Sequence, residues 1–206
     1  LFPWGFFLWM EWDRSLKTFS LKGKVLASLF QVVTPRTAGF HTMDVASIGT
    51  AAALLLMLLM FIGASPGSTG GGVKTNTVGV VFAFLRSKIA AKETAALFRR
   101  TIPPATIIRA FTVVSLALTF VFLFSFVLVL DQPELGLKEA AFEVISAFGT
   151  VGLSLGITPH LNAWAKIVIV VTMFIGRVGL LTLAFGLARP PAHGELVYAE
   201  EPVTIG

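Results

Sequence analysis

Hydrophobic residues gather into long uncharged runs that are separated by short connections rich in charge. Residues 45–73 carry no charged side chain, and neither do residues 110–130. As a helix, the second run would extend roughly 32 Å at 1.5 Å per residue, which is enough for one bilayer crossing. A third run, residues 167–188, is interrupted only by Arg177. The pattern therefore predicts an all-helical integral membrane protein.

Two shorter amphipathic segments, residues 24–34 and 138–148, alternate with these runs. A helix of this length covers about 16 Å, half the hydrocarbon thickness, so it can enter the bilayer but cannot cross it. Each segment is followed by a loop that contains glycine, residues 35–44 and 149–157. Non-helical backbone is tolerated at membrane depth only where it is buried in protein or lines water. The sequence predicts two re-entrant half-helices that lead into such loops.

These loops belong to an internal repeat. The sequence Thr-Ala-Gly-Phe at residues 37–40 recurs as Thr-Val-Gly-Leu at residues 150–153, which lies 113 residues later. Met-Phe-Ile-Gly at residues 60–63 recurs identically at residues 173–176, with the same offset. Two blocks in one register indicate two copies of a structural unit. Each unit holds a half-helix, a Thr-x-Gly-apolar loop and an apolar helix.

The repeated loops have features that attract cations. The negative end of each half-helix dipole points at its loop, and carbonyl oxygens there can replace the hydration shell of a monovalent cation. Glycine permits both unusual backbone angles and close approach to a central axis. We therefore expect a cation site at Gly39 and Gly152. The alternative is that these glycines only turn tight corners.

A glycine-rich segment, residues 61–75, breaks the first apolar helix. One interpretation is a phosphate cradle of a nucleotide-binding membrane enzyme that uses residues 67–75. Gly67 and Gly72 fit the Walker spacing, but Val73 stands between Gly72 and Lys74 and would turn the lysine away from the phosphates. The other interpretation, which we favour, is unwound backbone inside a membrane.

Composition supports the membrane interpretation. The 206 residues are 55% hydrophobic and only 13% charged, far from the usual quarter for soluble domains. The mean hydropathy is +0.85. The absence of cysteine excludes disulfides and thiolate metal sites. The chain begins with leucine inside an apolar aromatic run, so we expect that an N-terminal part is missing.

The net charge of +5 does not indicate nucleic acid, because the basic residues cluster between apolar runs. By the positive-inside rule, residues 86–103 are expected on the cytoplasmic side and residues 131–136 outside. Residues 13–24 disagree with this orientation, since they are also basic and should be external.

Four segments carry a resemblance to a known family. They are FQVVTPRTAGFHTMD at residues 30–44, MFIGASPGSTGGGVKT at 60–75, FEVISAFGTVGLS at 142–154 and MFIGRVG at 173–179. They resemble the Trk/Ktr/HKT superfamily of potassium uptake proteins, most of all the membrane subunit of the bacterial Ktr system. The likeness covers nearly the whole chain.

The resemblance implies helix, re-entrant pore-loop, helix repeats around a pseudo-fourfold cation pore. Residues 1–100 resemble the third of four repeats with its first helix truncated, and residues 101–190 resemble the fourth. Residues 191–206 would form a cytoplasmic C-terminal tail. Because two repeats cannot close a four-sided pore, the N-terminal half of the same protein would be required.

The resemblance also assigns roles to residues. The family's selectivity filter, with bound K+ at Gly39 and Gly152, maps to Thr37, Ala38, Gly39, Phe40, Thr150, Val151, Gly152 and Leu153. The family's intramembrane gate maps to residues 63–75, here Gly63, Ser65, Pro66, Gly67, Ser68, Thr69, Gly70, Gly71, Gly72 and Lys74, together with Arg177.

Arg177 is also singled out by its position near the middle of an apolar run. On insertion scales an arginine there costs about 2.5 to 3.5 kcal/mol, so it needs a partner or water. The repeat offset aligns it with Ala64, at the depth of the glycine-rich segment. We expect its guanidinium to donate to carbonyls or hydroxyls of that segment and to repel cations. The alternative is a plain clamp between helices.

Other polar residues are assigned smaller roles. We expect Glu143 to brace the filter through backbone amides, or else to bias the entrance electrostatically. Arg36 is expected to be a structural tie. The tryptophans are expected to be interfacial anchors, and the histidines lack ligand spacing. No arrangement of nucleophile and base is apparent, so we do not expect an enzyme. The tryptophans are Trp4, Trp9, Trp12 and Trp164, and the histidines are His41, His160 and His193.

The function expected from these features is channel-like potassium uptake across the bacterial plasma membrane. A sodium-selective transporter, or a Na+-coupled symport, remains an alternative, since serine in place of glycine in the first two pore loops would shift preference toward Na+. The resemblance implies a homodimer in membrane lipid and a cytoplasmic nucleotide-binding regulatory subunit, with residues 86–103 and the tail as contacts. No nucleic-acid partner is expected.

Overall fold

The computed structural model describes residues 2–92, 94–97 and 100–179, and this part of the chain is mostly helical, as predicted. It also contains one two-stranded antiparallel sheet in which Ala96 lies opposite Thr101. The α-helices are α1 (Phe2–Glu11), α2 (Leu21–Val33), α3 (Thr50–Phe61), α4 (Thr75–Ile89), α5 (Pro104–Asp131), α6 (Leu137–Phe148) and α7 (Ala163–Val178). The short elements are the 3-10 helices η1 (Val45–Ser47) and η2 (Thr158–His160) and the strands β1 (Ala96–Leu97) and β2 (Arg100–Thr101).

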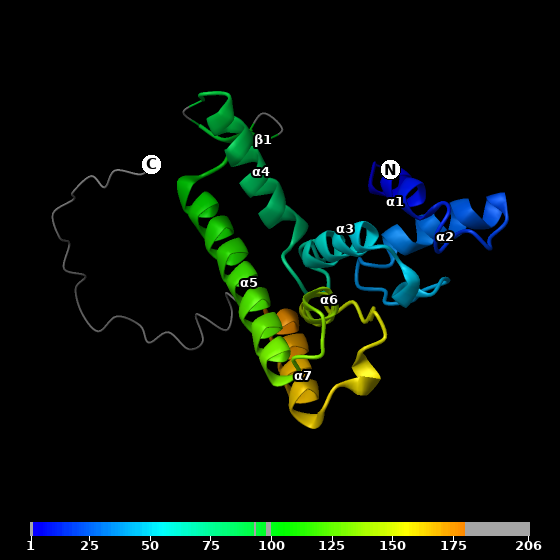
Figure 1. The fold of residues 1–206 in the computed structure, drawn as a ribbon. Helices are drawn as coiled ribbons and strands as arrows, with labels where there is room; N and C mark the ends of the chain where they lie inside the picture. The colour runs from blue at the N-terminus through cyan, green and yellow to red at the C-terminus, as the bar shows by residue number, and fades with distance from the viewer. Residues whose placement is uncertain (1, 93, 98–99, 180–206) are drawn as a thin grey trace.

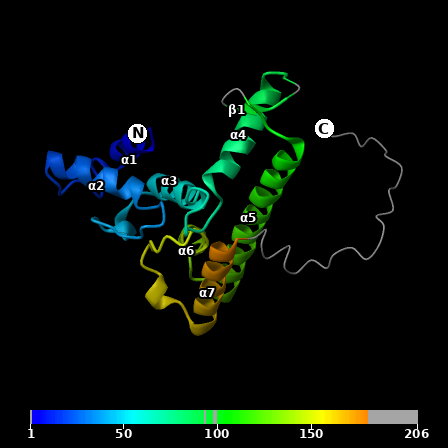
Figure 2. The same ribbon diagram turned by 180° about the vertical axis from the view of Figure 1, so that it is seen from behind.

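Helix α6 lies at the centre of the arrangement. It packs against α3 on one side and against α5 and α7 on the other. Helices α4 and α5 run side by side as a long hairpin that carries the small sheet at its far end (Figure 1). The view from behind shows α1 and α2 on the side of α3 that faces away from this hairpin (Figure 2).

The internal repeat is visible in the order of the elements. A half-helix, a bend, a 3-10 helix and an apolar helix follow one another in α2–η1–α3 and again in α6–η2–α7. The 3-10 helices begin at Val45 and Thr158, and the apolar helices at Thr50 and Ala163, so both pairs keep the offset of 113 residues. Two sequence blocks in one register therefore correspond to two copies of one structural unit.

One helix in the described part of the chain is long and apolar enough to cross a membrane. This helix is α5, with 28 residues and a mean hydropathy of 2.8 in its best window, and it contains the apolar run 110–130. Helix α3 is apolar but has only 12 residues. The predicted run 167–188 falls partly in α7, and its residues from 180 onward lie outside the described residues.

The two half-helices end in different ways. Helix α2 is capped by Ser20, whose hydroxyl accepts from the Gly23 amide at 3.3 Å, and it stops before Pro35, which has no N–H to continue the ladder. Helix α6 ends at Phe148, and the Gly149 amide makes the last helical bond, to the Ile145 carbonyl at 2.8 Å. Each half-helix thereby delivers its carbonyl end to a Thr-x-Gly bend.

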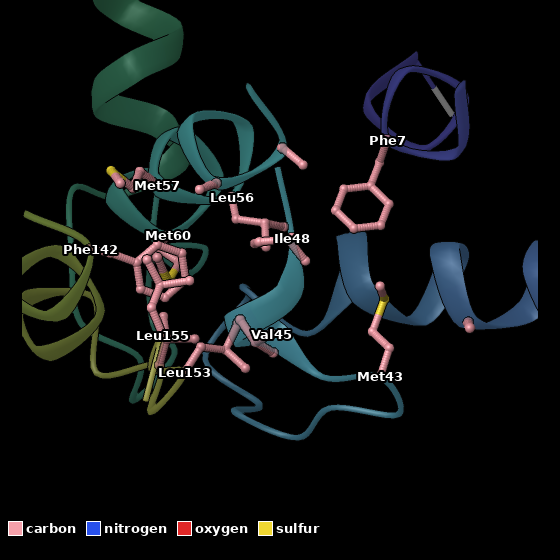
Figure 3. Packing of buried hydrophobic residues seen from close by; sticks show 14 of the residues in the cluster. Phe7, Met43, Val45, Ile48, Leu56, Met57, Met60, Phe142, Leu153 and Leu155 are labelled. Atoms are coloured by element: carbon pink, nitrogen blue, oxygen red, sulfur yellow. The ribbon is translucent and has the colours of Figure 1, made fainter. Parts of the chain in front are cut away.

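A shared hydrophobic core joins the two units. Phe142 of α6 lies against Leu56 and Met60 of α3, and Leu153 and Leu155 of the second bend complete the cluster (Figure 3). Fully burying a side chain of this size contributes about 1.5 to 3 kcal/mol. Because residues from both units fill one core, the two bends are held in a fixed relation.

A second cluster packs the opposite face of α6 against α5 and α7. Alanines occupy the close contacts there, at Ala140, Ala147 and Ala165, and Leu128 of α5 fills the space beside them. Small residues let helices approach closely where apolar packing alone must hold them. The central half-helix is thus fixed on both faces.

Candidate functional site

The two Thr-x-Gly bends have the same backbone conformation. The φ angles are +67° at Thr37 and +74° at Gly39, and +53° at Thr150 and +92° at Gly152. The residue between them has a negative φ in both bends. Such alternation turns the peptide planes so that carbonyls point to one side and N–H groups to the other. The repeat therefore extends from sequence to backbone angles.

The N–H side of each bend is bonded to the half-helix before it. The Ala38 amide donates to the Thr34 carbonyl at 3.0 Å. In the second bend the Thr150 amide donates to Ala147 at 3.0 Å, and the Val151 amide donates to Ser146 at 2.9 Å. Within the described ranges, no N–H or O–H donates to a carbonyl oxygen of residues 37–39 or 150–152. Hydrogen bonding within the described residues therefore involves the N–H side of each bend and leaves these carbonyl oxygens without a donor.

The bends lie in direct contact with each other. An alanine methyl at position 39 would lie 2.1 Å from the Val151 carbonyl oxygen, so the space admits glycine only. At position 152 the methyl would lie 3.9 Å from the Gly39 Cα, an ordinary contact distance, and only the positive φ requires glycine. The structure thus brings together the two glycines at which we expect the cation site.

Each bend has a different support. Thr34, buried at the end of α2, donates its hydroxyl to the Phe40 carbonyl. Glu143, which is 6% exposed, accepts from the hydroxyls of Ser154 at 2.8 Å and of Thr158. Glu143 therefore braces the second bend through hydroxyls. The expected bond to backbone amides is wrong, because both carboxylate oxygens accept from side-chain hydroxyls.

The glycine-rich segment forms a closed loop between α3 and α4. Its two ends are joined, since the Gly63 amide donates to the Val73 carbonyl at 2.9 Å and the Val73 amide donates to the Phe61 carbonyl at 3.0 Å. A methyl at position 63 would lie 1.9 Å from the Gly71 carbonyl oxygen. The loop is therefore tight enough at its base that a side chain at this position cannot be accommodated.

The middle of this loop lies directly against the two bends. A methyl on Gly70 would lie 2.8 Å from the Thr37 methyl, and one on Gly71 would lie 2.7 Å from the Thr150 methyl. The Gly71 amide donates to the Thr150 hydroxyl at 2.8 Å. The Gly72 amide donates at 3.1 Å to the carbonyl of Phe148, the last residue of α6. Successive glycines thus fit under the bends.

Three basic side chains donate to carbonyls of the same loop. Arg177 of α7 donates to Thr69, as expected from the repeat offset. Lys74 donates to Gly70 and, at 3.4 Å, to the Ser68 carbonyl. Arg36 donates to Gly63 at 3.1 Å, so the expected structural tie joins the first bend to the base of the loop.

A cavity of about 250 Å³ lies between the loop and α7, and Lys74 and Arg177 are among the residues that line it. In the described part of the chain the single carboxylate ion pair is Lys138 with Glu139, at 3.3 Å. The loop therefore holds basic groups that are bonded to carbonyls and are not paired with acids.

These contacts contradict a phosphate cradle. A cradle needs free amides, but the amides of Gly71 and Gly72 donate within the protein, and Lys74 binds carbonyls of its own loop. The extra residue Val73 is fully buried in the bridge at the base of the loop. The nucleotide-binding hypothesis for residues 67–75 is therefore wrong.

Two features were missed or incompletely anticipated from the sequence. Gln31 is fully buried on α2, and no described group hydrogen-bonds its amide. A glutamine in a half-helix that is otherwise mostly apolar was the available signal. Trp4 donates to the Ser28 hydroxyl at 3.0 Å, while Trp9 and Trp164 are exposed. His193 and the tail lie outside the described residues.

Comparison with known proteins decides the family. The profile of the TrkH family, described as cation transport protein, matches residues 2–191. The chain belongs to the TrkH family. The family is described as one of cation transport proteins, in agreement with the expectation that this chain does not belong to an enzyme family. The solved structure of the potassium transporter TrkH from Vibrio parahaemolyticus shares its fold, with a TM-score of 0.73 at 23% identity over 91% of this chain and 42% of that one.

Two TrkH-family relatives are more similar in sequence. The potassium/sodium uptake protein NtpJ of Enterococcus hirae is 38% identical over 98% of this chain and 47% of its own length. The Ktr system potassium uptake protein B of Bacillus subtilis is 42% identical over 81% of this chain and 37% of its own length. The chain thus spans less than half the length of these relatives.

Proposed function

We propose that this chain supplies two of the four repeats that surround the cation pathway of a potassium uptake protein. The observation that carries the proposal is the contact between the two Thr-x-Gly bends, which share one backbone conformation and leave their carbonyl oxygens unbonded. Carbonyl rings of this kind replace the hydration shell of an alkali cation. Residues 37–40 and 150–153 form the filter, with K+ bound beside Gly39 and Gly152.

The glycine-rich loop is the gate of this pathway. It lies against the filter threonines and is bonded to the last residue of α6, so it obstructs the space directly below the bends. Arg177 stabilises the obstructing position through Thr69, and its charge repels an approaching cation. Displacement of the loop, together with release of Arg177, opens the pathway.

The remaining architecture follows from this assignment. Residues 1–100 are the third repeat, residues 101–190 the fourth, and residues 191–206 the cytoplasmic tail. The protein crosses the bacterial plasma membrane with residues 86–103 on the cytoplasmic side. It works together with its N-terminal half, as a homodimer that binds a cytoplasmic regulatory subunit through these residues and the tail. Relatives named as parts of a Ktr system support such a partner.

A second candidate function is sodium transport or Na+-coupled uptake. The observation that favours it is the name of one relative, potassium/sodium uptake protein, which matches 98% of this chain. The same carbonyl geometry binds either ion, and the preference depends on all four bends together.

Growth of a potassium-uptake-deficient bacterium on limiting potassium tests the proposal. The full-length gene should restore growth, and Gly39→Ala should abolish it, because the methyl would overlap the Val151 carbonyl. The matched control is Gly79→Ala in α4, where a methyl meets nothing within 4 Å. Rescue by Gly39→Ala equal to that by Gly79→Ala would refute the filter. Growth that depends on added sodium would favour the second candidate.

A further inference from the structure

We propose that the Thr150 hydroxyl is the latch that holds the glycine-rich gate closed, and that it couples the gate to the filter of the fourth repeat. This inference rests on the proposed function, because it assigns the regulation of that same pathway. Thr150 is a filter residue by its backbone and a gate contact by its side chain. Its hydroxyl accepts the Gly71 amide at 2.8 Å.

The backbone of Thr150 is the first argument for a specific task. Its φ is +53°, and a β-branched residue with positive φ is a true outlier that costs free energy. Glycine would adopt the same angle without strain. Unlike glycine, threonine provides a hydroxyl here, and at position 150 that hydroxyl bonds the gate.

The fit of the gate glycines is the second argument. A methyl on Gly71 would lie 2.7 Å from the Thr150 methyl and 2.8 Å from the Phe148 carbonyl oxygen. The Gly72 amide donates to that same carbonyl at 3.1 Å. The loop is thus seated by two successive amides, one on the filter side chain and one on the end of α6. Lifting the loop away breaks both bonds.

The corresponding threonine of the third repeat provides an internal control. Thr37 has the same strained angle, +67°, and lies over Gly70, but in the described residues its hydroxyl bonds no part of the loop. Its contact with the loop is packing alone. The latch therefore belongs to Thr150, and removal of the hydroxyl should release the loop at Thr150 but not at Thr37.

A coupling between filter and gate follows from this geometry. Under the proposed function the carbonyl of Thr150 belongs to the filter, and its hydroxyl accepts the Gly71 amide of the gate. A cation that orders the Thr150 backbone also orders the acceptor of the Gly71 amide. Cation binding at the filter and the position of the gate therefore influence each other, because the filter carbonyl and the gate hydrogen bond both belong to Thr150.

Cation uptake by the full-length protein tests the latch. We expect Thr150→Val, which keeps the shape and removes the acceptor, to raise K+ or Rb+ uptake into potassium-depleted cells roughly fivefold with unchanged K+/Na+ preference. Thr150→Ser keeps the hydroxyl and should restore the wild-type rate. The matched control is Thr112→Val on α5, whose hydroxyl donates to the Ile108 carbonyl of its own helix, and this variant should change the rate less than twofold. A wild-type rate in Thr150→Val, or equal rates in the serine and valine variants, overturns the latch.

Hydrogen–deuterium exchange separates failure of the latch from failure of the proposed function, since it does not require transport. The peptide that contains residues 68–73 should exchange roughly fivefold faster in Thr150→Val than in the wild type, and not in Thr37→Val. Unchanged exchange overturns the latch. If Thr150→Val does not reach the membrane, Gly71→Ala tests the same contact, because its methyl would overlap Thr150 and the Phe148 carbonyl. Wild-type uptake and exchange in Gly71→Ala would also overturn the latch.

Discussion

The tetrapeptide Met-Phe-Ile-Gly occurs once in each repeat and leads into different structures. In the first unit α3 ends at Phe61, inside the tetrapeptide, and residues up to Lys74 are non-helical. In the second unit α7 continues through the equivalent position to Val178. The tetrapeptide itself cannot decide the outcome. Pro66 and the glycines that follow the first copy remove helical hydrogen bonds and stabilising side chains, whereas Arg177 follows the second copy.

The difference gives the two repeats complementary roles. The broken helix provides the loop that lies under the bends, and the continuous helix presents Arg177 to a carbonyl of that loop. The two bends have the same backbone conformation, but different side chains support them. The Thr34 hydroxyl donates to the Phe40 carbonyl in the first bend, whereas the Glu143 carboxylate accepts from the Ser154 and Thr158 hydroxyls at the second. The two bends therefore repeat the same backbone conformation, while the side chains that hold each bend in place differ.

The largest expected effect tests the inequality of the two glycines. Gly39→Ala combines a positive φ with a 2.1 Å overlap on the Val151 carbonyl oxygen, whereas Gly152→Ala carries the unfavourable φ alone. A left-handed alanine costs about 1 to 2 kcal/mol, and we expect Gly39→Ala to lose more than about 3 kcal/mol of unfolding free energy because the clash adds to it. Denaturant unfolding of the purified full-length protein measures both. Equal losses would contradict the contact between the bends.

The next effect tests the support of the fourth repeat. Glu143→Ala leaves the Ser154 and Thr158 hydroxyls without their acceptor and should cost about 2 to 3 kcal/mol. Glu143→Gln keeps one acceptor oxygen and should lose less. Thermal unfolding of the two variants in detergent distinguishes them. The equivalent residue of the third repeat is the partly exposed Phe30, so Phe30→Ala serves as the control and should cost less than Glu143→Ala. A Glu143→Ala midpoint equal to that of the wild type would remove the proposed brace.

The features of the two units that leave a local or periodic pattern in the sequence could be predicted from it. Uncharged runs, short amphipathic segments and a constant offset indicate helices, half-helices and repeated bends, because these features are local or periodic. The partner of Arg177 was also predictable, since alignment with Ala64 places it at the depth of the loop. The contact between Gly39 and Gly152 was expected only from the requirement that the bends face one pathway.

Other contacts could not be predicted because they depend on how distant segments meet. The hydrogen bond between Gly71 and Thr150 joins residues 79 positions apart, and neither residue signals the other. The partners of Glu143 were assigned wrongly for a related reason. The hydroxyls of Ser154 and Thr158 reach Glu143 only through the path of the chain after the second bend, and that path has no signature in spacing. The buried amide of Gln31 likewise follows from packing.

A smaller effect is expected from the two arginines that hold the glycine-rich loop. Arg177→Ala removes a charge-assisted bond to Thr69 and a charge from the pathway, and should raise cation flux about tenfold. Arg36→Ala loosens the base of the loop at Ile62 and Gly63 and should change flux less, because the loop ends remain bridged. Rubidium uptake with the full-length protein measures both, normalised to protein in the membrane. If Arg177→Ala is expressed normally and its cation flux is unchanged, Arg177 only holds helices together and does not act in the gate.

The smallest effect concerns the support of the third repeat. Thr34, which is 2% exposed, donates its hydroxyl to the Phe40 carbonyl, and the equivalent residue of the fourth repeat, Ala147, has no hydroxyl to donate. Thr34→Val keeps the shape and should lose about 1 kcal/mol of unfolding free energy, with Thr34→Ser close to the wild type. The bond orients only the Phe40 carbonyl of the first bend, so the variant should also alter the K+/Na+ ratio of uptake slightly while leaving the gate contacts intact. A loss as large as that of Glu143→Ala would mean that the two bends depend equally on side-chain support, and the inequality inferred from their surroundings would be wrong.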